Sequence, residues 1–182
     1  MKRCKKTILF IFVLGVLALD TEHGTAGPAL PEQRAISDEL LSLVGVTAAR
    51  LNVHVRQPGT SEAVELPVES LEKELVEICA DEDFEISNDP DDVVITIHVS
   101  LHDNLDHPTL MGYVVHLALE QEMHMPRLNR SMVVPTYTLL ESGFCTKEDL
   151  RDVVSGKLRI VMQTFLNHSG RANVVEANVT DE

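Results

Sequence analysis

Two neighbouring stretches of the chain, residues 93–103 and 110–125, alternate apolar with polar side chains over most of their length. Successive side chains of a β-strand point to opposite faces of the sheet, so this period of two predicts two strands with one apolar face each. The loop between them contains Asn, Asp and Pro and suits a hairpin longer than the tightest kind. Any fold that contains these strands needs to bury only one face of its sheet.

The same alternation predicts a strand at residues 51–55 and another at residues 132–141. The later strand contains Pro135, which has no N–H to donate to a neighbouring strand. We therefore expect this strand to lie at an edge of the sheet or to carry a bulge.

Apolar side chains recur at helical spacing in three further segments, residues 32–44, 71–79 and 150–165. Thr146 and Asp149 resemble a capping box in front of the last of these helices. The last helix is expected to end near Asn167, and residues 168–182 are expected to form a flexible tail.

The order of these elements predicts an α+β fold with an open, mostly antiparallel four-stranded sheet and with helices packed on one face. The order is β-α-β-β-β-α, preceded by a short helix. The helical crossover makes the first two strands parallel, and the remaining strands form an antiparallel meander. Residues 51–167 are then a single domain, preceded by a tether and short helix at residues 27–50.

The amino terminus has the three parts of a secretory signal peptide in their usual order. Four Lys/Arg side chains among the first six residues precede an apolar stretch at residues 7–19, and small residues stand at positions 24 and 26. The apolar stretch is shorter than the roughly 20 residues that a membrane-spanning helix needs. We expect residues 1–26 to be cleaved, with a cut after Ala18 as the alternative. The mature chain would be extracytoplasmic, either periplasmic or secreted.

The chain is acidic, with 29 Asp/Glu against 15 Lys/Arg and a formal net charge of −14. Such a charge repels phosphate backbones and anionic lipid surfaces. We therefore expect no nucleic-acid partner and no stable membrane insertion after cleavage. Solubility alone is a sufficient explanation for the charge.

In the order of its elements, the segment 51–167 resembles the small periplasmic domains of lipopolysaccharide-assembly lipoproteins, of transporter-auxiliary lipoproteins and of the Tol translocation protein's amino-terminal part. The resemblance implies a non-catalytic module in envelope assembly or transport. The chain departs from the lipoproteins because its early cysteine, Cys4, lies before the apolar stretch and not after it.

Three histidines, His54, His98 and His116, fall on the polar faces of three strands that should be close in the sheet. Side chains on neighbouring strands come within about 5 Å, which is near enough for imidazoles to share a metal ion. These residues are the candidate metal ligands, and no cofactor is indicated. The alternatives are a solvated histidine-rich face and a surface that titrates near neutral pH.

Cys79 and Cys145 are the two cysteines that remain after the expected cleavage. In an oxidising compartment they either form a disulfide or stay as two buried thiols. Cys145 precedes the last helix, where the helix dipole would lower the pKa of its thiol. The sequence places no histidine beside it, so a catalytic cysteine is not expected.

Together these patterns predict an exported, non-catalytic binding or assembly module of the cell envelope with a protein partner. The alternative is a metal-binding protein that uses the histidine face. The sequence contains no nucleophile elbow, no phosphate-binding glycine loop and no CxxC pair, so no enzyme class is indicated.

The otherwise polar face of the strand at residues 110–125 also carries the apolar side chains Leu110, Val114 and Ala118. The amino-terminal helix, a second copy or a partner could cover it.

Overall fold

The computed structural model describes residues 37–58 and 64–179. These residues belong to one compact unit that begins at Ala35. The predicted signal peptide, the tether and the first residues of the predicted amino-terminal helix lie outside the described residues.

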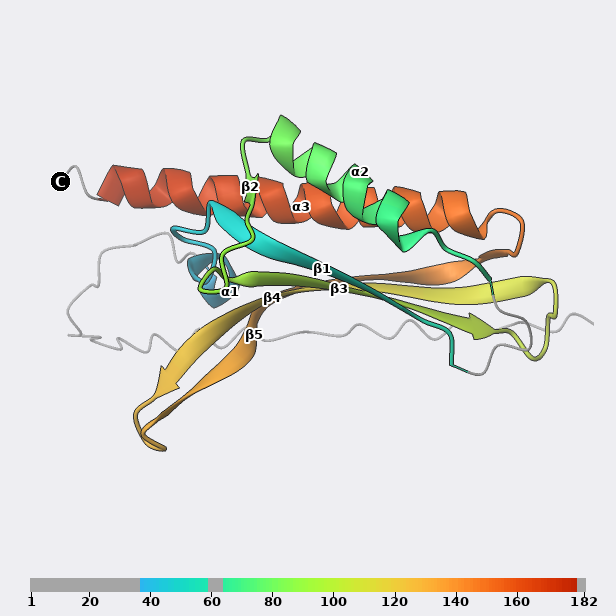
Figure 1. The fold of residues 1–182 in the computed structure, drawn as a ribbon, viewed down its shortest axis with the longest axis horizontal. Helices are drawn as coiled ribbons and strands as arrows, with labels where there is room; N and C mark the ends of the chain where they lie inside the picture. Colours follow the sequence, from blue (N-terminus) through green and yellow to red (C-terminus); the bar gives the residue numbers. More distant parts are fainter. Residues whose placement is uncertain (1–36, 59–63, 180–182) are drawn as a thin grey trace, which may run out of the picture. The chain divides into compact units, whose positions relative to one another are not determined.

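One mixed sheet holds all five strands, in the order β2-β1-β3-β4-β5 (Figure 1). β1 runs parallel to β2 and β3, whereas β3, β4 and β5 form an antiparallel meander. The α+β class, the parallel crossover and the meander are therefore confirmed. The strands are β1 (Ala48–Arg56), β2 (Glu85–Ile86), β3 (Val94–Asp103), β4 (Leu110–Met125) and β5 (Arg130–Thr146).

The expected number of four strands was wrong in one detail, because β2 is a fifth strand at the outer edge of β1. It is only two residues long and pairs in parallel with Ala48 and Ala49. Phe84, immediately before it, is buried and lies edge-on to Phe165 with ring centroids 5.6 Å apart. A strand this short shows no alternation, so the sequence pattern could not reveal it.

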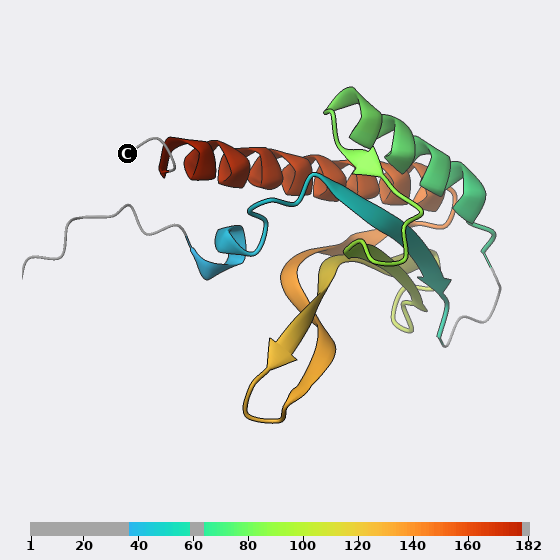
Figure 2. The same cartoon turned by 60° about the vertical axis from the view of Figure 1, so that its left-hand side comes forward.

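The helices are α1 (Asp38–Leu41), α2 (Val68–Asp81) and α3 (Leu150–Val179). As predicted, α2 and α3 lie on the same face of the sheet, as Figure 1 and Figure 2 show. The apolar faces of the strands meet these helices in the core. Its largest fully buried side chains include Leu75, Ile95, Ile97, Leu101, Met111, Leu117, Leu119, Leu158, Met162 and Phe165.

The start of α3 has the predicted capping contacts. The Thr146 hydroxyl donates to the Asp149 carboxylate at 2.7 Å and accepts from the Asp149 N–H at 3.3 Å. The second bond satisfies the Asp149 N–H, a backbone group that would otherwise be unpaired at the helix start.

The end of α3 differs from the expectation, because the segment predicted as a flexible tail from residue 168 continues the helix to Val179. The Ser169 hydroxyl is buried and donates to the Val46 carbonyl at 2.8 Å. Gly45, with a φ of 76°, donates its N–H to the Asn173 side chain at 2.8 Å. The turn after α1 thus holds the last turns of α3, through contacts that no local pattern encodes.

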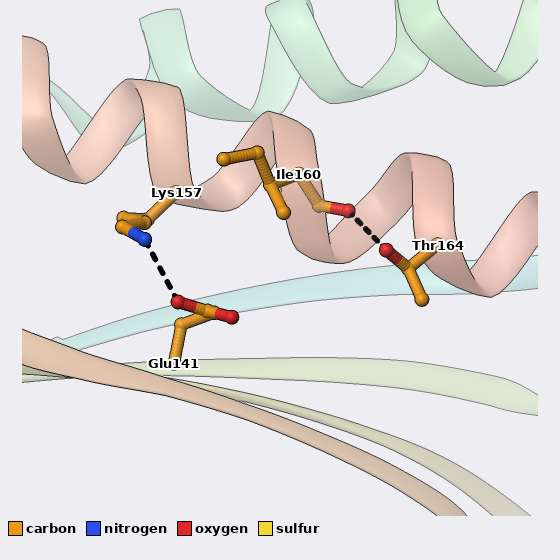
Figure 3. A network of polar contacts seen from close by, with 4 residues as sticks. All are labelled: Glu141, Lys157, Ile160 and Thr164. Atoms are coloured by element: carbon orange, nitrogen blue, oxygen red, sulfur yellow. Dashed lines mark hydrogen bonds and ion pairs between the residues drawn. The ribbon is translucent and has the colours of Figure 1, made fainter.

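Polar contacts tie the helices to each other and to the sheet. Glu74 of α2 accepts hydrogen bonds from Arg159 and from Ser155 of α3, and these bonds lower the pKa of its carboxyl group. Lys157 of α3 donates to Glu141 of β5 at 2.8 Å, which raises the pKa of the lysine (Figure 3). α3 is therefore bound at its sides as well as through its apolar stripe.

β5 is the edge strand that Pro135 predicted, and it also carries a bulge. Leu119 of β4 lies opposite Tyr137, but the next residue, Glu120, lies opposite Pro135. Thr136 is therefore an extra residue on β5, and its hydroxyl donates to the Leu119 carbonyl at 3.4 Å. Both alternatives for this strand, an edge and a bulge, are confirmed.

Two glycines of the β4–β5 pair lie opposite aromatic side chains. Gly143 is paired with Tyr113, and a Cβ atom at position 143 would lie 2.6 Å from the Tyr113 hydroxyl oxygen. Gly112 is paired with Phe144, whose ring would approach a Cβ atom at position 112 to 3.3 Å. The rings occupy the space that a side chain would need.

We predict opposite effects for two Gly→Ala substitutions. Gly143→Ala should lower the free energy of unfolding by about 1–3 kcal/mol, because the buried Tyr113 ring must move. Gly156→Ala should raise it by about 1 kcal/mol, since Gly156 is exposed within α3 and a Cβ there meets nothing within 4 Å. Urea unfolding followed by circular dichroism measures both. A Gly143→Ala variant that is at least as stable as the wild type would contradict the packing of Tyr113 on Gly143.

Candidate functional site

The sheet face opposite α2 and α3, called the open face below, carries neither of the long helices (Figure 1 and Figure 2). Short helix α1 contacts α3 and β5. Two side chains of the open face, Thr96 and Ala118, are buried. The open face is polar on β1 and β3 and becomes apolar towards β5. Its side chains, from β1 to β5, include Asn52, His54, Arg56, Thr96, His98, Ser100, His102, Leu110, Val114, His116, Ala118, Glu120, Thr138, Leu140, Ser142 and Phe144.

The structure brings the three predicted histidines together in one row across three strands. His98 lies opposite His54 on β1 and opposite His116 on β4. The ring centroids are 5.2 Å apart for His54 and His98 and 6.4 Å apart for His98 and His116. We call these residues the histidine row.

The rings of the histidine row are stacked, with interplanar angles of 24° and 13°. A metal ion lies in the plane of each ring that binds it, at about 2.0–2.1 Å from the nitrogen. Nearly parallel rings direct their nitrogens side by side and not at one point. In residues 37–58 and 64–179, no three His, Cys, Asp or Glu side chains are placed to hold a metal ion. A shared ion would require the rings to turn, so the metal site stays a prediction.

His98 lies at the centre of the row. Partial burial lowers its pKa, and the positive charge of His54, Arg56 and His116 lowers it further. Glu120 acts in the opposite direction. Burial and cationic neighbours together therefore disfavour the protonated form of His98.

The histidine row ends at an exposed apolar side chain on the edge strand. Leu140 lies opposite His116 and is 62% exposed, and Phe144 on the same face of β5 is 69% exposed. Large apolar side chains at an unpaired sheet edge are typical of an interaction surface. The alternation of the sequence placed Leu140 on a strand, but its predicted strand stopped at residue 141 and did not include Phe144.

Beyond the bulge, the β4–β5 hairpin continues as a two-stranded arm that extends away from α2 and α3 in Figure 1. We call residues 121–134 the hairpin arm. Four of its apolar side chains are at least 40% exposed: Met123, Met125, Leu128 and Val133. Sequence reasoning identified both strands of the arm and missed its exposure, because alternation does not show how far a hairpin outruns the helices that cover a sheet.

Cys79 and Cys145 are both free thiols. Cys79 is fully buried in α2, where burial raises the pKa of its thiol to about 11. Cys145 lies at the end of β5, and burial together with the Asp149 carboxylate raises the pKa of its thiol. The expected effect of the helix dipole is thus outweighed, and both sulfurs carry protons at neutral pH, which makes them weak nucleophiles.

No known protein family matches this chain, and no curated protein is similar to it. Among solved structures, the chain is similar to the 2.35 Å crystal structure of a minor lipoprotein from Acinetobacter baumannii. The two are 15% identical, the match covers 74% of this chain and 95% of that chain, and the TM-score is 0.31. None of the helices in the described part of the chain is long and apolar enough to cross a membrane.

We predict that His98 makes stability depend on pH. Its pKa in the folded protein is lowered from the ordinary 6.5, so the unfolded chain binds this proton more readily. The contribution of His98 to the free energy of unfolding is therefore fully present above pH 6.5. It is lost as the pH falls through 6.5 towards the pKa of His98 in the folded state. His98→Gln should flatten this decline, measured by urea unfolding at several pH values.

His102→Gln is the matched control, since His102 lies on the same strand and face but opposite Gly112 and outside the row. It should keep the wild-type decline. Equal slopes in the two variants would show that the stacked row is not the source of the pH dependence.

Proposed function

We propose that the chain is an exported, non-catalytic binding or assembly module of the cell envelope, whose protein partner contacts the open face at β5. The observation that carries the proposal is the pair of exposed side chains Leu140 and Phe144 on the edge strand, beside the histidine row. The exported location is argued from the basic start and the apolar stretch within residues 1–26.

The edge of β5 supports this choice of surface. In the part of the chain that the structure describes, β5 is the last strand of the sheet, so its outer N–H and C=O groups have no strand opposite them. An extended segment of a partner can add to such an edge through main-chain hydrogen bonds. Side chains at Leu140 and Phe144 would then give apolar contact, at about 25 cal/mol per Å² removed from water.

The non-catalytic part of the proposal is supported by the chemistry of the reactive groups. The pKa values of both thiols are raised, so neither is activated as a nucleophile. The imidazoles of the histidine row lie opposite one another and a leucine, and Glu120, the carboxylate that acts on His98, accepts a hydrogen bond from Thr96 at 3.1 Å. A general base is normally oriented by a direct hydrogen bond to a carboxylate or another polar group.

Site-specific photo-crosslinking in producing cells tests the proposed surface. A photoreactive residue at Leu140 or Phe144 should give a discrete adduct in the extracytoplasmic fraction. The matched control is Ile160 on α3, which is also apolar and is 47% exposed, and which lies among the helices drawn in Figure 3. Adducts from Ile160 but none from the two open-face positions would refute the proposal, as would a chain that remains in the cytoplasm.

Metal binding is the second candidate, and the in-register histidine row is the observation that favours it. Calorimetric titration with zinc, copper and nickel distinguishes the two. Because the rings are stacked, we expect only weak heats from the wild-type chain. Stoichiometric binding that His98→Ala abolishes and His102→Ala retains would instead establish the metal function.

A further inference from the structure

The hairpin arm is a two-stranded ribbon with solvent on both sides. Every residue from Glu122 to Ser131 is exposed, and the view in Figure 2 again shows the β4–β5 hairpin leading away from the two long helices. At its end, the N–H of Leu128 donates to the Met125 carbonyl at 3.0 Å, and the N–H of Asn129 donates to the Pro126 carbonyl at 3.2 Å. The tip is therefore a defined turn that presents its side chains outward.

The tip of the arm is apolar. Met125 is 40% exposed and Leu128 is 53% exposed, while Met123 at 48% lies directly opposite Met132 on the other strand. Methionine is flexible and polarizable, so it adapts to irregular or fluid partners. Leaving such side chains in water is unfavourable, and their clustering at a projecting turn indicates a surface that becomes buried in use.

The tip of the arm is also basic, whereas the chain as a whole is acidic. Residues 123–140 contain no Asp or Glu but include Arg127 and Arg130, whereas the whole chain has a net charge of −14. Arg127 and Arg130 are exposed, and neither forms an ion pair with any carboxylate in residues 37–58 and 64–179. By contrast, Arg159 and Lys157 of α3 each bind a glutamate.

We propose that residues 125–132 of the hairpin arm dock on an anionic lipid surface. The apolar side chains Met125, Leu128 and Met132 enter the boundary between headgroups and acyl chains. Arg127 and Arg130 pair with lipid phosphates. The proposal rests on the proposed function only for the exported location of the chain.

The negative net charge does not oppose this docking, because the charges are separated in space. Salt screens charge over about 8–10 Å under physiological conditions, so a projecting tip is governed by its own two arginines. The net charge of the whole sequence predicted repulsion from anionic lipid surfaces and no stable membrane insertion. The structure shows that this net charge combines an acidic body with a basic, apolar arm.

Vesicle co-sedimentation tests the proposal with the protein purified as its host exports it, after mass spectrometry has identified its first residue. We expect binding to phosphatidylcholine vesicles that contain about one third phosphatidylglycerol, and weaker binding as salt is raised. The Arg127→Gln, Arg130→Gln double variant should lower the partition coefficient roughly 10-fold or more, since each basic side chain contributes about fivefold. Leu128→Ser should lower binding as well.

Two matched variants isolate the arm. Arg151→Gln with Arg171→Gln makes the same change in net charge on α3, and Leu105→Ser removes a leucine that is 92% exposed in the β3–β4 loop. Both should bind vesicles like the wild type, and circular dichroism checks that every variant is folded.

Three results would overturn the proposal. The first is an absence of vesicle binding, and the second is equal loss in the arm and control variants. The third is a change of oligomeric state in the arm variants with unchanged vesicle binding, which would make the arm a contact between copies. The crosslinking experiment at Phe144 does not depend on any of these results. Failure of the lipid proposal would therefore not refute the proposed function.

Discussion

The fully buried ring of Phe165 lies at the point where α3, the segment before β2 and β5 meet, with ring centroids 5.6 Å from Phe84 and 5.8 Å from Tyr137. The Tyr137 hydroxyl in turn shares a hydrogen bond of 2.6 Å with the His168 ring. This packing fixes the middle of α3 on one face of the sheet. Because the strands are apolar on that side only, one layer of helices satisfies the hydrophobic requirement of the fold. The histidine row and the edge residues of β5 are consequences of that one-sided burial.

The bulge at Thr136 has a second effect on the same sheet. It lies where α1 and the turn after it meet the strands: the Ser42 hydroxyl donates to the Thr136 carbonyl at 3.0 Å, and Gln121 donates to the Ser42 carbonyl at 3.2 Å. Bulges increase the local twist of a strand pair and redirect it. On one side of the bulge, residues 110–119 of β4 and 137–146 of β5 lie in the part of the sheet that α3 covers. On the other side, the two strands continue as the hairpin arm. A single extra residue therefore separates the part of the hairpin that builds the core from the part that faces outward.

The elements that the sequence predicted well are those whose signal is local. The strand at residues 110–125 is found with the predicted limits, and Pro135 marks an edge strand with a bulge. The side-by-side placement of His54, His98 and His116 was anticipated because each occupies the polar face of its strand, although the register that aligns them required the structure. The strand β2 and the last turns of α3 were missed because their partners, such as Val46 for Ser169, are distant in the sequence. The stacked orientation of the imidazoles depends on side-chain torsions, about which alternation carries no information.

The net charge of the sequence likewise gives no information about which charges lie close together in the fold. The net charge of −14 counts every charged side chain equally, whereas in the folded chain some of them form ion pairs and others do not. Lys157 and Arg159 are matched by Glu141 and Glu74 in contacts that hold α3 in place, so their charge is largely compensated within the fold. Arg127 and Arg130 have no such partners among the described residues and stand beside exposed methionine and leucine side chains. An unpaired charge acts on whatever approaches it, whereas a paired one acts on its neighbour. Candidate surfaces for recognition are those where the fold leaves charge or apolar area uncompensated, and among the described residues the β5 edge of the open face and the tip of the hairpin arm are two of them.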